Sequence, residues 1–99
     1  ETHIRHLNEV GASEPIFVET QLLGFDEKRI RINHILIHTP SGNTLATGEH
    51  MLLHVNTEKG HAVQMGKAIY EILEKIWEGH QNLAVPEYAG KGIMQLKNL

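Results

Sequence analysis

The sequence contains no cysteine. Disulfide bonds, thiolate metal sites and a cysteine nucleophile are therefore excluded, and the absence fits a reducing compartment. The chain also has no apolar run of membrane-spanning length, and no basic segment followed by an apolar one that would resemble a secretory leader. These absences predict a cytoplasmic protein without a membrane partner.

The sequence also has no excess of positive charge. Nine Lys and Arg residues against twelve Asp and Glu residues give a formal net charge of −3 over 99 residues. Such a chain has no electrostatic footprint for nucleic acid, so we expect no nucleic-acid partner. With 40% apolar residues, the length and composition predict one globular domain with a single modest core.

Aromatic residues are few, at one Trp, two Tyr and two Phe, whereas there are eight His residues. Histidine titrates near neutrality and is the commonest metal ligand, so this excess needs an explanation. His34 and His38 would share one strand face, as would His50 and His54, and two such pairs could in principle hold zinc. However, there is no His-Glu-x-x-His motif and no tight His spacing. We therefore predict no metal site.

The first half of the chain reads as strands separated by turns. Runs rich in β-branched residues are separated by Gly, Pro, Asn and Ser. The predicted strands are residues 2–7, 15–24, 29–39 and 44–56. The segment "PSGN" predicts a hairpin between the last two strands, and "FDEKR" predicts another between the second and third. We expect a meander, in which each strand pairs with the next.

The hydrophobic period changes after residue 61. From Met65 to Trp77, apolar residues recur at steps of three and four, with charged residues between them. This pattern predicts an amphipathic helix over about 62–79. The domain would span residues 1–84, and the Gly- and Pro-containing residues 85–99 would form an irregular tail.

The third predicted strand changes parity along its length, because Ile30 and Ile32 alternate with one phase and Ile35 and Ile37 with the other. Either a bulge lies near Asn33 or both faces of the sheet are buried. An antiparallel sheet that is apolar on both faces needs cover on both, and one helix covers one face. The second cover would come from an N-terminal segment or from a second copy of the chain.

Several stretches resemble a known family. "ETHIR", "VETQLLGFDEKR", "MLLHV" and "PEYAGKGI" look like the thioesterases of the hot-dog fold, in particular the betainyl-CoA thioesterases of carnitine catabolism, some of which are fused to carnitine dehydrogenase. The resemblance covers about residues 1–93. It implies an α+β fold with a hot-dog-like antiparallel sheet, a homo-oligomer with active sites between protomers, and hydrolysis of an acyl-CoA thioester with no further cofactor.

The resemblance begins at the second strand of the family's fold. In the family, a first strand and a long central helix carry a motif of the kind Asp-x-Asn-Gly-His-Met-Asn, which is thought to supply the catalytic acid or base. This sequence has no match to that motif. We therefore expect a domain truncated at its N-terminus, in which the helix around Met65 to Trp77, or a partner's copy of it, takes the place of the central helix. Two functions stay open: an acyl-CoA thioesterase, or a non-catalytic remnant that serves binding or assembly.

The candidate catalytic pair follows from hairpin geometry. If Pro40 faces Asn43 across the turn, then His34 lies beside Glu49. A carboxylate beside an imidazole in apolar surroundings could orient it and activate a water for attack on a thioester. We predict His34 and Glu49 as catalytic residues, with mutual hydrogen bonding in a half-buried sheet as the alternative. A change of one residue in the turn would pair His34 with His50 instead.

Three arginines are candidates for binding coenzyme A. The planar guanidinium matches phosphate oxygens, so Arg5, Arg29 and Arg31 could meet the phosphates of the ligand. A solvated surface is the alternative reading of the same residues.

Overall fold

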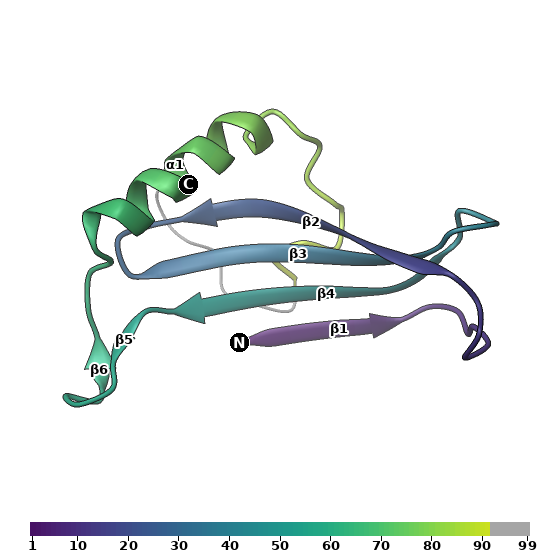
Figure 1. Cartoon of the computed structure of the whole chain (residues 1–99), viewed down its shortest axis with the longest axis horizontal. Coiled ribbons are helices and arrows are strands. Elements are labelled where there is room, and N and C mark those ends of the chain that lie inside the picture. The colour runs from purple at the N-terminus through teal and green to yellow at the C-terminus, as the bar shows by residue number, and fades with distance from the viewer. Residues whose placement is uncertain (92–99) are drawn as a thin grey trace.

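The computed structural model describes residues 1–91 and contains a four-stranded antiparallel sheet with a helix packed at its end (Figure 1). The sheet strands are β1 (Thr2–His6), β2 (Ile16–Phe25), β3 (Arg29–His38) and β4 (Thr44–Leu53), and the helix is α1 (Lys67–His80). The α+β class expected from the sequence is confirmed. The part of the predicted tail from 92 to 99 lies outside the described residues. No helix within residues 1–91 is long and apolar enough to cross a membrane.

The strand order is β1-β4-β3-β2, so the expected meander is wrong for β1, which pairs with β4 rather than with β2. The connection after β1 is held across the end of the sheet. The N–H groups of Leu7 and Asn8 donate to the Leu45 carbonyl at 2.9 and 3.0 Å, and the Thr39 N–H donates to the Pro15 carbonyl at 3.1 Å. The connection therefore passes the ends of β4 and β3, and β2 pairs at the edge of the sheet opposite β1.

The hairpin between β2 and β3 forms as predicted and is closed by Asp26. Its carboxylate accepts hydrogen bonds from the N–H groups of Lys28 and Arg29 at 2.9 and 2.8 Å, and it pairs with the Arg29 guanidinium at 2.6 Å. Partial burial pushes the pKa of Asp26 upward, but the hydrogen bonds from the Arg29 side chain and the two N–H groups, with the Arg29 charge, outweigh it. The net pKa lies below the ordinary value of 3.8.

No bulge occurs at Asn33, so the two phases of the β3 pattern point to the two faces of the sheet. Ile30 and Ile32 pack against the helix on one face, and Asn33 is fully buried on the other. The register shifts lie elsewhere, between Leu22 and Gly24 in β2 and after Leu36 in the hairpin of β3 and β4.

The helix begins later than the predicted residue 62. His61 and Ala62 form β6 (His61–Ala62), which pairs with β5 (Val55–Asn56) in a two-stranded ribbon. The turn between them contains Gly60 with a φ of 70°, a conformation that favours glycine. Apolar residues before Gly66 therefore belong to the ribbon and the linker, and α1 ends at His80.

The core lies between α1 and the end of β2. Leu22, Phe25 and Leu73 are buried there, and the Phe25 ring meets the rings of Tyr70 and Trp77 edge-on, with centroids 5.3 and 6.4 Å apart. This burial of large apolar rings is the main force that holds the helix on the sheet.

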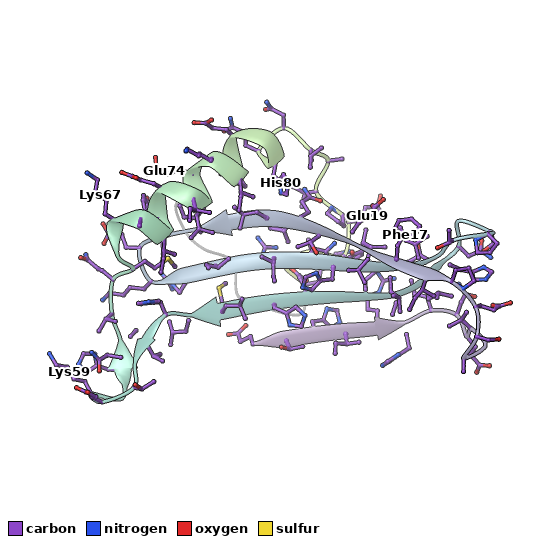
Figure 2. The ribbon with its side chains drawn as sticks, viewed as in Figure 1. Phe17, Glu19, Lys59, Lys67, Glu74 and His80 are labelled. Carbon is purple, nitrogen blue, oxygen red and sulfur yellow. The ribbon has the colours of Figure 1, made fainter. Side chains whose placement is uncertain are left out.

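A side-chain hydrogen bond also attaches the helix to the edge strand. The Leu22 N–H donates to Nδ1 of His80 at 2.9 Å. Figure 2 shows His80 on the side of α1 that faces β2, whereas Lys67 and Glu74 point away from the sheet. The last turn of α1 thus satisfies a backbone donor at the β2 bulge.

The two faces of the sheet differ. We call one the open face; its side chains include Ile4, Val18, Thr20, Leu22, Ile32, His34, Leu36, Ala46 and His50. The other, the covered face, carries Arg5, Arg31, Asn33, Thr47, Glu49 and Met51. After α1, residues 81–91 run past β2 and behind β3 in the view of Figure 1, over the covered face. Helix α1 covers only the Leu22 end of the open face.

Candidate functional site

The register of the hairpin between β3 and β4 separates the predicted catalytic pair. His34 pairs with Gly48 and Asn33 pairs with Glu49. Because neighbouring positions in a strand point to opposite faces, the His34 side chain lies on the open face and the Glu49 side chain on the covered face. The predicted contact between His34 and Glu49 is therefore wrong, and the two residues belong to different environments.

The open face carries a groove of about 440 Å³ in the part that α1 leaves uncovered. It is lined by Ile4, Val18, His34, Leu36, Ala46, Thr47, Gly48 and His50. Most of its wall is aliphatic, and its lining includes two imidazoles. Such a concave, mostly apolar surface with few polar groups is typical of small-molecule binding sites.

The two imidazoles of the groove lie side by side, with the ring centroids of His34 and His50 5.5 Å apart. Nδ1 of His34 is 2.8 Å from the Thr20 hydroxyl, and Nδ1 of His50 is 3.0 Å from the Thr2 hydroxyl. Each ring is thus oriented through the same nitrogen by a threonine on an edge strand. The Nε2 atoms have no such partner among the described hydrogen bonds.

Gly48 provides the room for this arrangement. It lies opposite His34 in the strand pair, and a Cβ atom at this position would stand 3.2 Å from Nε2 of His50. That separation is tighter than an ordinary van der Waals contact, so a larger residue would push the His50 ring aside. Gly48 therefore belongs to the candidate site although it carries no functional group.

Glu49 is buried at 1% exposure beneath the tail. One carboxylate oxygen, Oε2, accepts hydrogen bonds from the Arg31 guanidinium at 3.0 Å and from the Gly90 N–H at 2.7 Å. The other, Oε1, is 3.9 Å from Nδ1 of His3. Next to this carboxylate, the hydroxyl of Tyr88 donates to the side-chain carbonyl of Asn33 at 3.0 Å. The cluster joins the tail to the covered face.

The three arginines predicted to bind coenzyme A all have partners within the chain. Arg31 is paired with Glu49, Arg29 with Asp26, and the Arg5 guanidinium lies 4.6 Å from the centre of the Tyr88 ring. By strand parity, all three point away from the groove. Their role in binding phosphate stays a prediction.

In each histidine pair considered for zinc, one member makes contacts with other residues. His38 bonds the Ser41 hydroxyl at 2.6 Å and lies 2.9 Å from a Glu14 carboxylate oxygen, while His54 bonds the Val63 carbonyl at 3.0 Å. Within residues 1–91, no group of three or more His, Asp or Glu side chains is placed to hold a metal ion.

Sequence reasoning identified His34 but missed the residues that make its site. His50 entered only as an alternative partner, and Thr2, Thr20 and Gly48 were not singled out. The alternation of β4 places Gly48 on the same face as Ala46 and His50, which is the signal that could have identified it.

Comparison with known proteins gives a consistent picture. A family model described as the thioesterase-like superfamily matches residues 1–73. The L-carnitine dehydrogenase/betainyl-CoA thioesterase of Agrobacterium fabrum is 44% identical over 97 residues, which cover 98% of this chain and 20% of that protein. The betainyl-CoA thioesterase of Pseudomonas aeruginosa is 39% identical over 93 residues, which cover 94% of this chain and 58% of that protein. The chain thus spans less than two-thirds of the length of either relative.

Solved structures share the same arrangement. A candidate thioesterase from Pseudomonas putida KT2440 is 33% identical and superposes with a TM-score of 0.78 over 98% of this chain and 61% of that one. A hypothetical protein from Staphylococcus aureus, solved in complex with CoA, is 19% identical and superposes with a TM-score of 0.84 over 97% of this chain and 60% of that one. The hot-dog-like fold expected from the sequence is confirmed.

Proposed function

Because the chain belongs to the thioesterase-like superfamily, we propose that it is the sheet domain of an acyl-CoA thioesterase. The reaction is hydrolysis of an acyl-CoA thioester to a carboxylic acid and coenzyme A. The observation that carries the proposal is the open groove, because it places aliphatic walls and two imidazoles on one surface of the family's sheet. A thioesterase site uses both: an apolar wall against the acyl group and polar groups at the carbonyl.

A betainyl thioester is the substrate we propose first. The relatives that match nearly the whole chain are named for betainyl-CoA. Coenzyme A itself is supported as a ligand by the S. aureus structure, which was solved with CoA. Arg5, Arg29 and Arg31 are proposed for its phosphates, and each would have to exchange its present partner for the ligand.

We also propose that the chain forms a homo-oligomer in the cytoplasm. The support for self-association is the open face, where Ile4, Val18 and Leu52 are about half exposed. Soluble monomers rarely expose a contiguous apolar surface of this kind. The absence of cysteine supports the cytoplasmic location, and cell fractionation would test it.

Thiol release from a panel of acyl-CoA esters, including betainyl-CoA, tests the reaction. The chain has no cysteine, so a thiol-specific reagent reports only the coenzyme A that is freed. We expect turnover, and we expect Val18→Lys in the groove to lower kcat/KM by about 10-fold or more, because a charged amine replaces an apolar contact. Its matched control is Phe17→Lys, the neighbouring position on the other face of the same strand.

The outcomes separate the two functions left open by the sequence. Turnover that Val18→Lys reduces and Phe17→Lys does not would support a thioesterase with its site in the groove. Binding of CoA by the folded chain without turnover on any ester would instead favour the non-catalytic binding module.

A further inference from the structure

We infer that His34 and His50 work as a pair that receives the thioester carbonyl in the groove, with Thr20, Thr2 and Gly48 as its positioning residues. The inference deepens the proposed function and rests on it. Three independent observations carry it: the contact of the two rings, the matching threonine bonds, and the glycine beneath them.

The threonine bonds determine what each imidazole offers the groove. A neutral imidazole has one N–H and one bare nitrogen, and a hydroxyl can either donate or accept. Where threonine donates to Nδ1, Nε2 carries the proton and is a donor; where threonine accepts from Nδ1, Nε2 is a base. The rings of His34 and His50 bond Thr20 and Thr2 through Nδ1 in this way, so the pair can present one donor and one base at once.

This combination matches the needs of thioester hydrolysis. One imidazole takes a proton from a water molecule as the water oxygen forms a bond to the carbonyl carbon. The N–H of the other imidazole stabilises the negative charge that develops on the carbonyl oxygen. Collapse of the intermediate breaks the carbon–sulfur bond, and the departing thiolate receives the proton from the first imidazole. The products are a carboxylic acid and coenzyme A, and both imidazoles return to their starting state.

Gly48 leaves room for the two rings to approach each other because it has no side chain. Strand pairing sets Gly48 directly opposite His34, and the His50 ring leans over the same glycine. A residue with a Cβ would displace the His50 ring while leaving its chemistry intact. Gly48→Ala is therefore a geometric test of the pair, separate from removal of either imidazole.

Kinetics on variants of the full chain form the first test. We expect His34→Gln and His50→Gln each to lower kcat by about 100-fold or more with little change in KM, since general acid–base catalysis contributes on this scale. Thr20→Val and Gly48→Ala should lower kcat in the same sense but by less. Matched controls are His61→Gln in the exposed ribbon, Thr57→Val, and Gly79→Ala, where a Cβ would have no neighbour within 4 Å.

Nuclear magnetic resonance of the histidine ring protons forms the second test, and it does not require turnover. The probe is a ketone analogue of betainyl-CoA in which a methylene replaces the thioester sulfur, so that its carbonyl cannot be hydrolysed. We expect the His34 and His50 ring signals to shift on titration, while those of His61 and His80 stay in place. His34→Gln and His50→Gln assign the two signals.

The kinetic and NMR results together show whether the histidine pair, the hydrolysis or both must be rejected. Turnover that is unchanged in His34→Gln and His50→Gln relative to His61→Gln would overturn the pair and leave the thioesterase proposal standing. No turnover with shifted His34 and His50 signals would overturn hydrolysis and keep the pair as a carbonyl-binding site. Neither turnover nor a ring shift would overturn both.

Discussion

Glu49 shows how the surroundings of a single residue decide its use. Its carboxylate is held by Arg31 and by the Gly90 backbone on the face away from the groove. A buried carboxylate that accepts two such bonds holds a guanidinium and a chain segment in place. This bonding favours a structural role, whereas the sequence pattern predicts a catalytic one.

We therefore predict that Glu49→Gln destabilises the domain by about 2–4 kcal/mol, because it leaves the Arg31 charge buried without a counter-charge. Urea unfolding followed by Trp77 fluorescence measures the change. Glu71→Gln is the matched control, since Glu71 makes only an exposed pair with Lys67 and should change stability by less than about 0.5 kcal/mol. A loss of kcat in Glu49→Gln with unchanged stability would instead support the catalytic role predicted from the sequence.

The sequence could not assign the face of Glu49 because that face depends on the turn. The prediction placed Pro40 opposite Asn43. In the structure, the His38 N–H donates to the Asn43 carbonyl, and the strand register also shifts after Leu36. The change at the turn moves the pairing by two positions and the shift after Leu36 moves it back by one, and the single net step exchanges the faces. Turn length and bulges are local geometries that hydrophobic alternation does not encode.

Among the elements, the hairpin of β2 and β3 carries a pH-dependent contact. The folded pKa of Asp26 lies below its ordinary value, so its contribution to stability is present above the unfolded pKa and is lost as the pH falls through the folded pKa. We predict that the stability difference between the wild type and Asp26→Asn is constant near neutrality and shrinks below about pH 4. Urea unfolding at a series of pH values measures it, with Glu58→Gln in the exposed ribbon as the control. A difference that stays the same at about pH 2 would contradict the assignment.

Helix α1 depends on one deeply buried side chain. Leu73 is 9% exposed, whereas its neighbour Ile72 is 59% exposed. We predict that Leu73→Ala lowers the free energy of unfolding by about 2–3 kcal/mol and that Ile72→Ala lowers it by less than about 1 kcal/mol. The same urea experiment compares them. Equal losses would mean that the Ile72 side of the helix is also packed in solution.

The type of each main element could be predicted from the sequence, but some boundaries and neighbours could not. Alternation identified the strands and the three-to-four period identified α1. The predicted helix start was too early. His61 and Ala62 lie just before the helical pattern, but they pair with Asn56 and Val55 in a short ribbon. The predicted position of β1 in the sheet was wrong because the connection from β1 to β2 crosses the end of the sheet. The backbone hydrogen bonds that hold this connection at Leu45 leave no hydrophobic pattern in the sequence.

At the scale of the whole molecule, the two faces are covered unequally. The tail lies on the covered face, while α1 packs over the Leu22 end of the open face and leaves the groove open. Over the middle of the face, the prediction that the chain's own α1 takes the place of a central helix is therefore wrong, whereas the alternative, a partner's copy of that helix, stays a prediction. The prediction that both faces need cover stays a prediction, supported by the half-exposed aliphatic side chains on the open face.

A second copy of the chain is the cover that we predict, and two neighbouring leucines can test it. Leu52 lies on the open face and is 47% exposed; Leu53 lies on the other face and is 54% exposed. If copies pack through the open face, Leu52→Lys brings like charges together at a symmetric contact and weakens association by at least about 10-fold. Leu53→Lys adds the same charge at similar exposure and should leave association unchanged.

Light scattering at several protein concentrations gives the mass of each variant. A wild-type oligomer that Leu52→Lys dissociates and Leu53→Lys does not would place the contact on the open face. An oligomer that resists Leu52→Lys would place the contact elsewhere, and a monomeric wild type would contradict self-association altogether. Because the groove lies on the same face, turnover measured on the dissociated variant would also tell whether the site belongs to one chain or needs the second.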